Sequence, residues 1–333
     1  MSQAAAPGIM PEAAVASRLH RLVYRDLPAA VRRVRRCPPG PRANVLEASR
    51  MSTHADYAAR AKEDAASGET DAPSGRSFAE DIADGFSRAD LAWHLANLDL
   101  RNRNRHSRIG RGWFAITQAI GVAGIGTVYG KVFGLPLDVF IPYLASGLVA
   151  WALIAGFIGE ATGTFVASAP YLTQMRLPLS LFALRAVFRN AVQFSFRATV
   201  VVAAFALFGH VPGPEALLAL PGVLLVLASG AGLALVGGML GARFRDLGPF
   251  VTAILPFLFL ITPIIWMADR LGDARWIVVY NPLYHYVKVV RGPLLGHDDL
   301  VTSFAVVSAS TVLLLAGGAA VLRAVGRRIV FWL

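Results

Sequence analysis

The sequence predicts an all-α integral membrane protein with six transmembrane helices, a cytoplasmic interfacial helix before the first span, and a re-entrant helical pair before the sixth. Composition supports this fold class: of 333 residues, 55% are hydrophobic and 16% charged, whereas soluble domains have about 45–50% and about 25%. In addition, six apolar stretches reach the length of about 20 residues with which a helix crosses a bilayer. A soluble enzyme and a disordered chain are therefore both excluded.

Residues 1–85 are expected to form a cytoplasmic N-terminal extension without a fixed fold. They contain no apolar run of span length, and residues 64–76 are rich in Ala, Ser, Gly and acidic residues, which is typical of a flexible linker. Met51 offers an alternative start, which would make the first fifty residues dispensable. A basic amphipathic helix over residues 12–36, lying on a membrane surface, is the alternative interpretation.

Residues 86–112 are expected to form an amphipathic interfacial helix followed by a basic stretch. Leu91, Leu95 and Leu98 recur at i, i+4 and i+7 beside Trp93, a spacing that places an apolar stripe along a helix. The basic stretch that follows contains Arg101, Arg103, Arg105, Arg108 and Arg111. Because these side chains can meet anionic headgroups, we expect the helix to lie on the cytoplasmic leaflet.

The six predicted spans lie within residues 113–333, which form the transmembrane domain. They run from Trp113 to Phe133, Val139 to Ile158, Leu184 to Phe208, Ala216 to Leu240, Phe250 to Met267, and Val301 to Leu322. The loops after spans two and four and the C-terminus carry Arg176, Arg243, Arg245, Arg327 and Arg328. Since basic loops remain in the cytoplasm, both termini are predicted to be cytoplasmic.

The segment between spans five and six is unusual. Trp276 to Val290 is rich in apolar and aromatic residues but is interrupted by Asn281 and Pro282, so it cannot form one straight span. Irregular backbone is tolerated at membrane depth only where protein covers it or a wet cavity borders it. We therefore expect two short helices that dip into the outer leaflet.

The predicted spans contain almost no groups that carry charge. None of the six cores contains Asp, Glu or His, and this weakens both an ion-coupled carrier and an intramembrane hydrolase. Arg197 is the clear exception, and two interpretations remain open: it lines a path for an anionic substrate, or it has a packing partner. Arg185 and Arg189, nearer the cytoplasmic end of the same span, are expected to snorkel to the interface.

The sequence also lacks an ATP-binding motif. The single Gly130-Lys131 pair fails as a phosphate loop, because Ile125 and Val132 occupy the positions where Gly and Ser or Thr are needed. We predict that the chain is not an enzyme and holds no cofactor or metal. The net charge of +11 comes without a nucleic-acid recognition motif, so nucleic acid is not an expected partner.

A transporter without its own energy source needs a partner that supplies work. The candidate contact is the amphipathic segment after span two, formed by Tyr171, Leu172, Thr173, Gln174, Met175 and Arg176. It is predicted to present a short cytoplasmic helix to a groove on the partner; the alternative is a solvated loop.

Several motifs between the spans carry a resemblance to a known family. They are the basic stretch before Trp113, Arg243-Phe244-Arg245-Asp246-Leu247, Thr262-Pro263-Ile264-Ile265-Trp266, Asn281-Pro282-Leu283-Tyr284-His285-Tyr286, and Arg291-Gly292-Pro293-Leu294-Leu295-Gly296. From Leu91 to Leu333 the chain resembles the transmembrane permease subunit of type-2 ABC exporters, in the polysaccharide, O-antigen and teichoic-acid branch. It is most similar to mycobacterial galactan (arabinogalactan precursor) exporters.

The resemblance implies a homodimer bound to two copies of a cytoplasmic ABC ATPase, which holds ATP and Mg. The dimer would export a glycan on an undecaprenyl diphosphate carrier across the cytoplasmic membrane of a bacterium, in contact with membrane lipids. Tyr171 to Arg176 would couple to the ATPase, and Leu91 to Asn102 would lie at the interface. An outer gate would be formed by Trp276, Asn281, Pro282, Tyr284, His285, Tyr286 and Arg291.

Three other functions are alternatives to glycan export. A drug or antibiotic efflux permease of the same superfamily would keep the six spans. A membrane-embedded polyprenyl-phosphate transferase would need a carboxylate pair or a metal motif at the membrane face, which is missing from the sequence. A passive channel or assembly factor would function without an ATPase.

Overall fold

The computed structural model describes residues 78–103, 105, 107–175, 177–267, 276–296, 299–326, 329 and 332. They belong to one compact unit, Pro73–Leu333. Residues 1–77, which include Met51 and most of the predicted extension, lie outside the described part of the chain. Arg176, Arg327 and Arg328 also lie outside it.

Every regular element among the described residues is helical. The α-helices are α4 (Phe78–Ser87), α5 (Ala89–Arg103), α6 (Trp113–Phe133), α7 (Leu137–Ala161), α8 (Ala169–Gln174), α9 (Leu179–Phe208), α10 (Ala219–Arg243), α11 (Leu247–Ile261), α12 (Trp276–Val279), α13 (Pro282–Leu294) and α14 (Val301–Val325). Three short 3₁₀ turns, η2 (Gly110–Gly112), η3 (Val166–Ser168) and η4 (Pro214–Leu218), precede α6, α8 and α10. The all-helical class is as predicted.

Four helical segments are long and apolar enough to cross a membrane. They are Leu137–Ala161, Leu179–Phe208, Pro214–Arg243 and Val301–Ala324, and they correspond to predicted spans two, three, four and six. The first and fifth predicted spans are also helical, as α6 with 21 residues and α11 with 15 residues. Their role as spans remains a prediction.

Helix α11 ends earlier than the sequence pattern suggested. The fifth span was predicted to continue to Met267, whereas the helix stops at Ile261 and Thr262 is extended, with φ −87° and ψ 130°. Pro263 is the physical cause, because a proline disfavours the helical conformation of the residue before it. At 1.5 Å per residue, 15 residues reach about 22 Å, which is less than the about 30 Å of a hydrocarbon core.

The centre of the core is α7. Most of its residues from Phe140 to Phe157 are buried, and they pack with side chains of α9, α10 and α13 in one hydrophobic cluster. Helices α10 and α14 pack side by side, and a Cβ atom at Gly232 would overlap the backbone of Leu314. Glycine is therefore needed at this contact between the two helices.

The segment predicted to lie on the leaflet is α5, which packs against α9. Its buried residues are Ala92, Leu95, Ala96 and Leu100. Of the predicted apolar stripe, Leu98 is 49% exposed and Trp93 is 42% exposed. The Trp93 ring lies edge-on to the Phe188 ring of α9, with the ring centres 5.6 Å apart. The interfacial location of α5 remains a prediction.

Residues 78–85 were expected to have no fixed fold, but they form most of helix α4. The contacts of Asp81 explain this difference. Its carboxylate accepts the backbone N–H groups of Leu179 and Ser180, both at 3.0 Å, at the first turn of α9. A carboxylate at this place satisfies donors that have no partner within the helix and complements the helix dipole.

Candidate functional site

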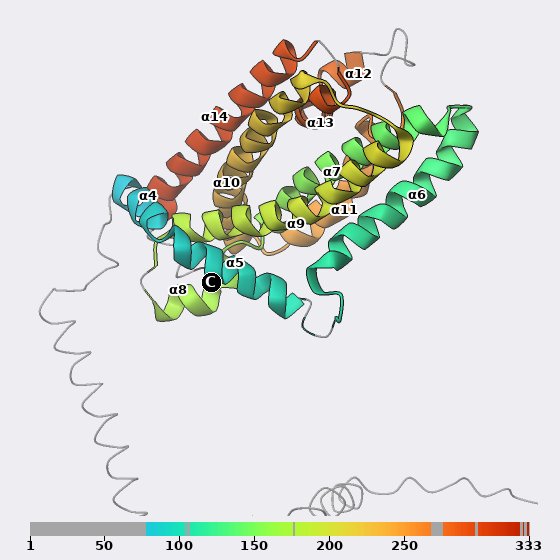
Figure 1. Ribbon diagram of the computed structural model, residues 1–333. Helices are drawn as coiled ribbons and strands as arrows, with labels where there is room; N and C mark the ends of the chain where they lie inside the picture. The colour runs from blue at the N-terminus through green and yellow to red at the C-terminus, as the bar shows by residue number, and fades with distance from the viewer. Residues whose placement is uncertain are drawn as a thin grey trace, which may run out of the picture. The chain divides into compact units, whose positions relative to one another are not determined.

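The predicted coupling and gate segments lie at opposite ends of the helical unit. Figure 1 shows α8 beside α5 at one end, and α12 and α13 at the other. The connection between these ends is made by α7, α9, α10 and α14, each of which has 25 residues or more. A movement at one end can therefore reach the other through rigid elements.

Five charged side chains form a cluster between α5, α7 and α9. Arg185 Nε donates to Asp99 Oδ2 at 2.8 Å, and its Nη2 pairs with the other oxygen of the same carboxylate. Arg189 pairs with Asp99 at 3.0 Å and with Glu160 at 2.9 Å. The more exposed Arg103 also pairs with Glu160, at 3.8 Å, so three guanidinium groups face two carboxylates.

The spacing of the two arginines explains the cluster. Arg185 and Arg189 are four residues apart on α9 and therefore lie on the same face of the helix. Their side chains are only 9% and 19% exposed. The expectation that they snorkel to the interface is wrong, because Asp99 and Glu160 compensate their charge inside the protein.

The charged cluster extends to the segment predicted to contact the ATPase. The Arg185 guanidinium lies 5.4 Å from the centre of the Tyr171 ring, and its Nη1 donates to Ser168 Oγ at 3.4 Å. Tyr171 belongs to α8 and Ser168 to the turn before it. Arg185 therefore links α8 to Asp99 on α5.

Within the predicted coupling segment, the side chains point in different directions. Leu172 is buried in a hydrophobic cluster with Leu179 and Phe182, whereas Tyr171 is 36% exposed and Met175 is 53% exposed. The side chains of Thr173 and Gln174, and all of Arg176, lie outside what the structure describes. Among the described side chains, the surface available to a partner therefore includes Pro170 and Tyr171 on α8 and Met175 directly after it.

Most residues of the predicted gate lie at the start of α13 or within it. Asn281 is the N-cap of α13: its side-chain oxygen accepts the backbone N–H of Leu283 at 3.0 Å, and Pro282 occupies the first helical position. The amide nitrogen of Asn281 donates to Thr262 Oγ1 at 3.2 Å. The start of α13 is thereby tied to the point where α11 ends.

Further along α13, polar side chains bind to its neighbours. The ring nitrogens of His285 contact Ser303 Oγ at 3.0 Å and the carbonyl oxygen of Val279 at 2.9 Å, while the Tyr286 hydroxyl donates to Ser229 Oγ at 2.8 Å. Tyr284 is half-buried, and Trp276 on α12 is 62% exposed. His285 and Tyr286 thus hold α13 against α14 and α10.

Arg291 anchors the other end of α13. It is 6% exposed, its Nη1 donates to the carbonyl oxygen of Pro263 at 3.0 Å, and its guanidinium lies 4.2 Å from the centre of the Tyr143 ring. The Tyr143 hydroxyl in turn donates to the carbonyl oxygen of Trp266 at 2.9 Å. Two carbonyl oxygens of the non-helical segment 262–266 thus accept hydrogen bonds from side chains of α7 and α13.

Arg197 stands apart from both of these groups. It is half-buried on α9, with Nη1 at 3.4 Å from the carbonyl oxygen of Ala152 on α7 and with the guanidinium 5.5 Å from the centre of the Phe114 ring on α6. In the part of the chain that the structure describes, no carboxylate forms an ion pair with Arg197. Its guanidinium retains donors that can bind an anion.

Sequence reasoning missed the acidic partners Asp99 and Glu160 and the aromatic partner Tyr143. A weak signal was available for Tyr143, since a tyrosine within an apolar span needs a partner for its hydroxyl. Across the described ranges, no group of three or more His, Cys, Asp or Glu side chains is arranged to hold a metal ion.

Comparison with known proteins identifies the family. The model of the ABC-2 type transporter family matches residues 92–295, from the second turn of α5 to the end of α13. The chain belongs to the ABC-2 type transporter family. This confirms the resemblance to type-2 ABC permeases, and it makes the chain a multi-pass membrane permease whose ATPase is a separate subunit.

Two relatives of the ABC-2 permease carry a more specific description. Both are O-antigen export system permease proteins RfbA of Klebsiella pneumoniae, 27% and 26% identical over 204 residues. The aligned region covers 58% of this chain and 76% of each relative.

Proposed function

We propose that the chain is the membrane-spanning subunit of an ATP-driven exporter that moves an undecaprenyl-diphosphate-linked polysaccharide across the cytoplasmic membrane. The polysaccharide is of the O-antigen, galactan or teichoic-acid type. Two copies of the chain form a homodimer with two copies of an ABC ATPase, and both termini face the cytoplasm. The similarity to O-antigen export permeases carries this proposal.

The geometry of the coupling end supports the assignment of energy input. A partner that pushes on Tyr171 and Met175 acts on α8, and Arg185 passes the displacement to Asp99 on α5 and, through Arg189, to Glu160 on α7. Ion pairs that are shielded from water are well suited to this role, because a displaced member leaves an uncompensated charge behind. The cluster therefore favours concerted movement of α5, α7 and α9 over independent movement.

The geometry of the opposite end supports an outer gate. Arg291 and Asn281 join α13 to residues 262–263, which are not regular helix, and such a segment can rearrange without breaking a helical hydrogen-bond ladder. Movement of α7 reaches α13 through the Tyr143 ring, which contacts Arg291. Opening would thus follow movement at the cytoplasmic end.

The experiment that tests this proposal measures on which side of the membrane the lipid-linked glycan lies. Depletion of the protein in its own bacterium should leave full-length, lipid-linked glycan on the cytoplasmic side, measured by extracting the carrier-linked pool and probing its accessibility in sealed vesicles. Unchanged sidedness of the glycan, together with altered tolerance to small amphiphilic drugs, would favour a drug-efflux permease instead.

A further inference from the structure

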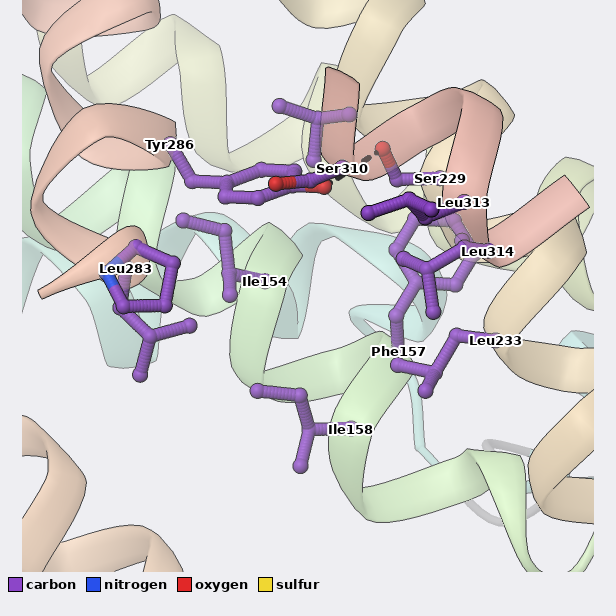
Figure 2. Close-up of a pocket in the computed structure, with 13 residues that line it drawn as sticks. Ile154, Phe157, Ile158, Ser229, Leu233, Leu283, Tyr286, Ser310, Leu313 and Leu314 are labelled. Atoms are coloured by element: carbon purple, nitrogen blue, oxygen red, sulfur yellow. Dashed lines mark hydrogen bonds between the residues drawn. The ribbon is translucent and has the colours of Figure 1, made fainter. Parts of the chain in front are cut away.

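An apolar pocket lies between α7, α10, α13 and α14, apart from the charged cluster and from Arg197. It has a volume of about 400 Å³, within the range of small-molecule sites. In Figure 2, Tyr286 and Ser229 lie at one end of the pocket, and Phe157, Ile158 and Leu233 lie at the other. The wall is made almost entirely of aliphatic and aromatic carbon.

The few hydroxyl groups at this pocket are already bonded within the protein. Tyr286 donates to Ser229, whose Oγ also contacts Thr311 Oγ1 at 2.7 Å and the carbonyl oxygen of Leu225 at 2.9 Å. Ser310 donates to the carbonyl oxygen of Val306 at 2.8 Å. A sugar or a phosphate entering the pocket would lose its hydrogen bonds to water without replacement. The pocket therefore selects against polar ligands.

The shape of the pocket fits an extended chain. On α10 its wall runs from Val226 to Leu233, a separation of seven positions that corresponds to about 10 Å along the helix axis. Pro282 and Leu313 also line the pocket and are exposed, so they mark its mouth on the surface of the helices. Around a transmembrane helix this surface meets lipid, whose tails run roughly parallel to the helices.

We propose that this pocket binds a hydrocarbon chain of a membrane lipid, inserted along α10 with its tip against Phe157 and Leu233. The proposal rests on the membrane location of the chain and not on the identity of the exported substrate. Because Leu283 and Tyr286 belong to α13, the bound chain contacts the predicted gate helix directly. Its release or entry would change the packing of α13 against α10.

Photolabelling of the full-length protein in nanodiscs tests the proposal. One sample contains a phosphatidylglycerol with a diazirine at the end of one acyl chain, and a second contains a polyprenyl phosphate with a diazirine at the end of its chain. After irradiation, peptide mapping should find label on α7 and α10 residues of the pocket. It should exceed the label on Val202 and Leu207, which lie on an exposed face of α9.

Filling the pocket provides the matched comparison. Leu233→Trp should reduce pocket labelling by about tenfold, equivalent to about 1.4 kcal/mol of binding free energy. Leu224→Trp, on the same helix but 65% exposed, should leave the labelling unchanged. Ile158→Trp blocks the pocket from α7 and replaces Leu233→Trp if the latter elutes as an aggregate in gel filtration.

The two probes distinguish the source of the chain. Labelling by the acyl probe alone identifies a phospholipid that supports the fold, and labelling by the polyprenyl probe alone identifies a carrier lipid; both outcomes support a hydrocarbon site. The proposal is overturned if neither probe labels the pocket above the level at Val202 and Leu207. It is also overturned if the pocket-filling variants Leu233→Trp and Ile158→Trp are labelled as strongly as the unchanged protein. These results do not depend on whether glycan export itself is demonstrated.

Discussion

The guanidinium of Arg185 on α9 and the carboxylate of Asp99 on α5 form a two-point ion pair, with Nε 2.8 Å from Oδ2 and Nη2 beside the second oxygen. This geometry uses the fork of arginine, which a lysine cannot reproduce. The Arg185 side chain is 9% exposed, so its charge depends on this partner. The pair makes α5 part of the helical unit and not a freely attached segment.

The first prediction concerns this pair. Asp99→Asn removes the negative charge that faces Arg185 and Arg189 and leaves Glu160 as the nearest compensation. We expect the protein to lose about 2–3 kcal/mol of stability, below the about 3–5 kcal/mol of fully buried pairs because Asp99 is 24% exposed. The measurement is the thermal midpoint of the detergent-solubilised protein.

Asp90→Asn is the matched control for this prediction. Asp90 is an exposed carboxylate on the same helix α5, so its substitution changes the net charge equally without uncovering a buried cation. Equal thermal midpoints for the two variants would show that the Asp99 pair does not stabilise the fold.

The positions of most helices could be predicted from sequence, and the reason is physical. Apolar runs of span length have one stable solution in a bilayer, so the helices Val301–Val325 and Trp113–Phe133 begin at the predicted residues. Helix ends set by a contact with a segment far away in the sequence could not be predicted in this way. Asp81 extends the order of the chain into residues 78–85 through hydrogen bonds to residues about 100 positions away.

The candidate site was predictable as segments but not as contacts. Asn281 and Pro282 are residues typical of an N-cap and of the first helical position, so they predict the start of a helix, and α13 begins there. The partners of Arg291 and Arg185 come from other helices, at Tyr143 and Asp99, and no local pattern identifies such pairs. Leu172 illustrates the same limit: its amphipathic neighbours suggested a surface position, whereas tertiary packing buries it.

The second prediction tests the contact between α7 and the break after α11. Tyr143→Phe removes the hydroxyl that donates to the carbonyl oxygen of Trp266, which costs about 1–3 kcal/mol when a buried acceptor is left unpaired. Hydrogen exchange in the segment 262–266 should become faster. Tyr280→Phe is the control, since Tyr280 is 82% exposed. Unchanged exchange in Tyr143→Phe would exclude a role for this hydroxyl in holding the segment.

The third prediction concerns the orientation in the membrane. In a Cys37→Ser background, a cysteine at Glu215 should react with an impermeant thiol reagent added from outside intact cells, and a cysteine at Met175 should react only after the cells are opened. Both positions are exposed in the structure, so accessibility depends on the side of the membrane. Labelling of the Met175 position from outside would reverse the orientation and remove the basis for the coupling surface.

The fourth prediction concerns that coupling surface. Met175→Asp places a charge on an apolar surface that is 53% exposed, so the permease should fold normally but copurify with less of its ATPase. Val211→Asp, at a position that is 86% exposed in the connection between α9 and α10, should copurify with the normal amount. Leu172→Asp should instead lower the amount of folded protein, because Leu172 is buried. Normal copurification of Met175→Asp would place the ATPase contact elsewhere.

The last prediction concerns Arg197 and the substrate. A diphosphate that enters a region of low dielectric constant needs nearby positive charge, and a guanidinium offers two parallel hydrogen bonds to phosphate oxygens. Arg197 is half-buried and forms no ion pair with the described carboxylates, so a substrate does not have to compete with an internal anion for it. Arg197→Gln should therefore reduce export by about tenfold, the effect of about 1.4 kcal/mol, while membrane abundance stays within about twofold of normal. Arg197→Lys should restore export only in part, because lysine keeps the charge without the two parallel donors of the guanidinium.

Lys131→Gln, which removes an exposed charge at the end of α6, is the control and should export normally. If Arg197→Gln lowers abundance and export by the same factor, then its bond to the carbonyl oxygen of Ala152 and its position beside Phe114 define a packing role. The assignment of Arg197 to the substrate path would then be wrong, whereas the proposed export function would stand.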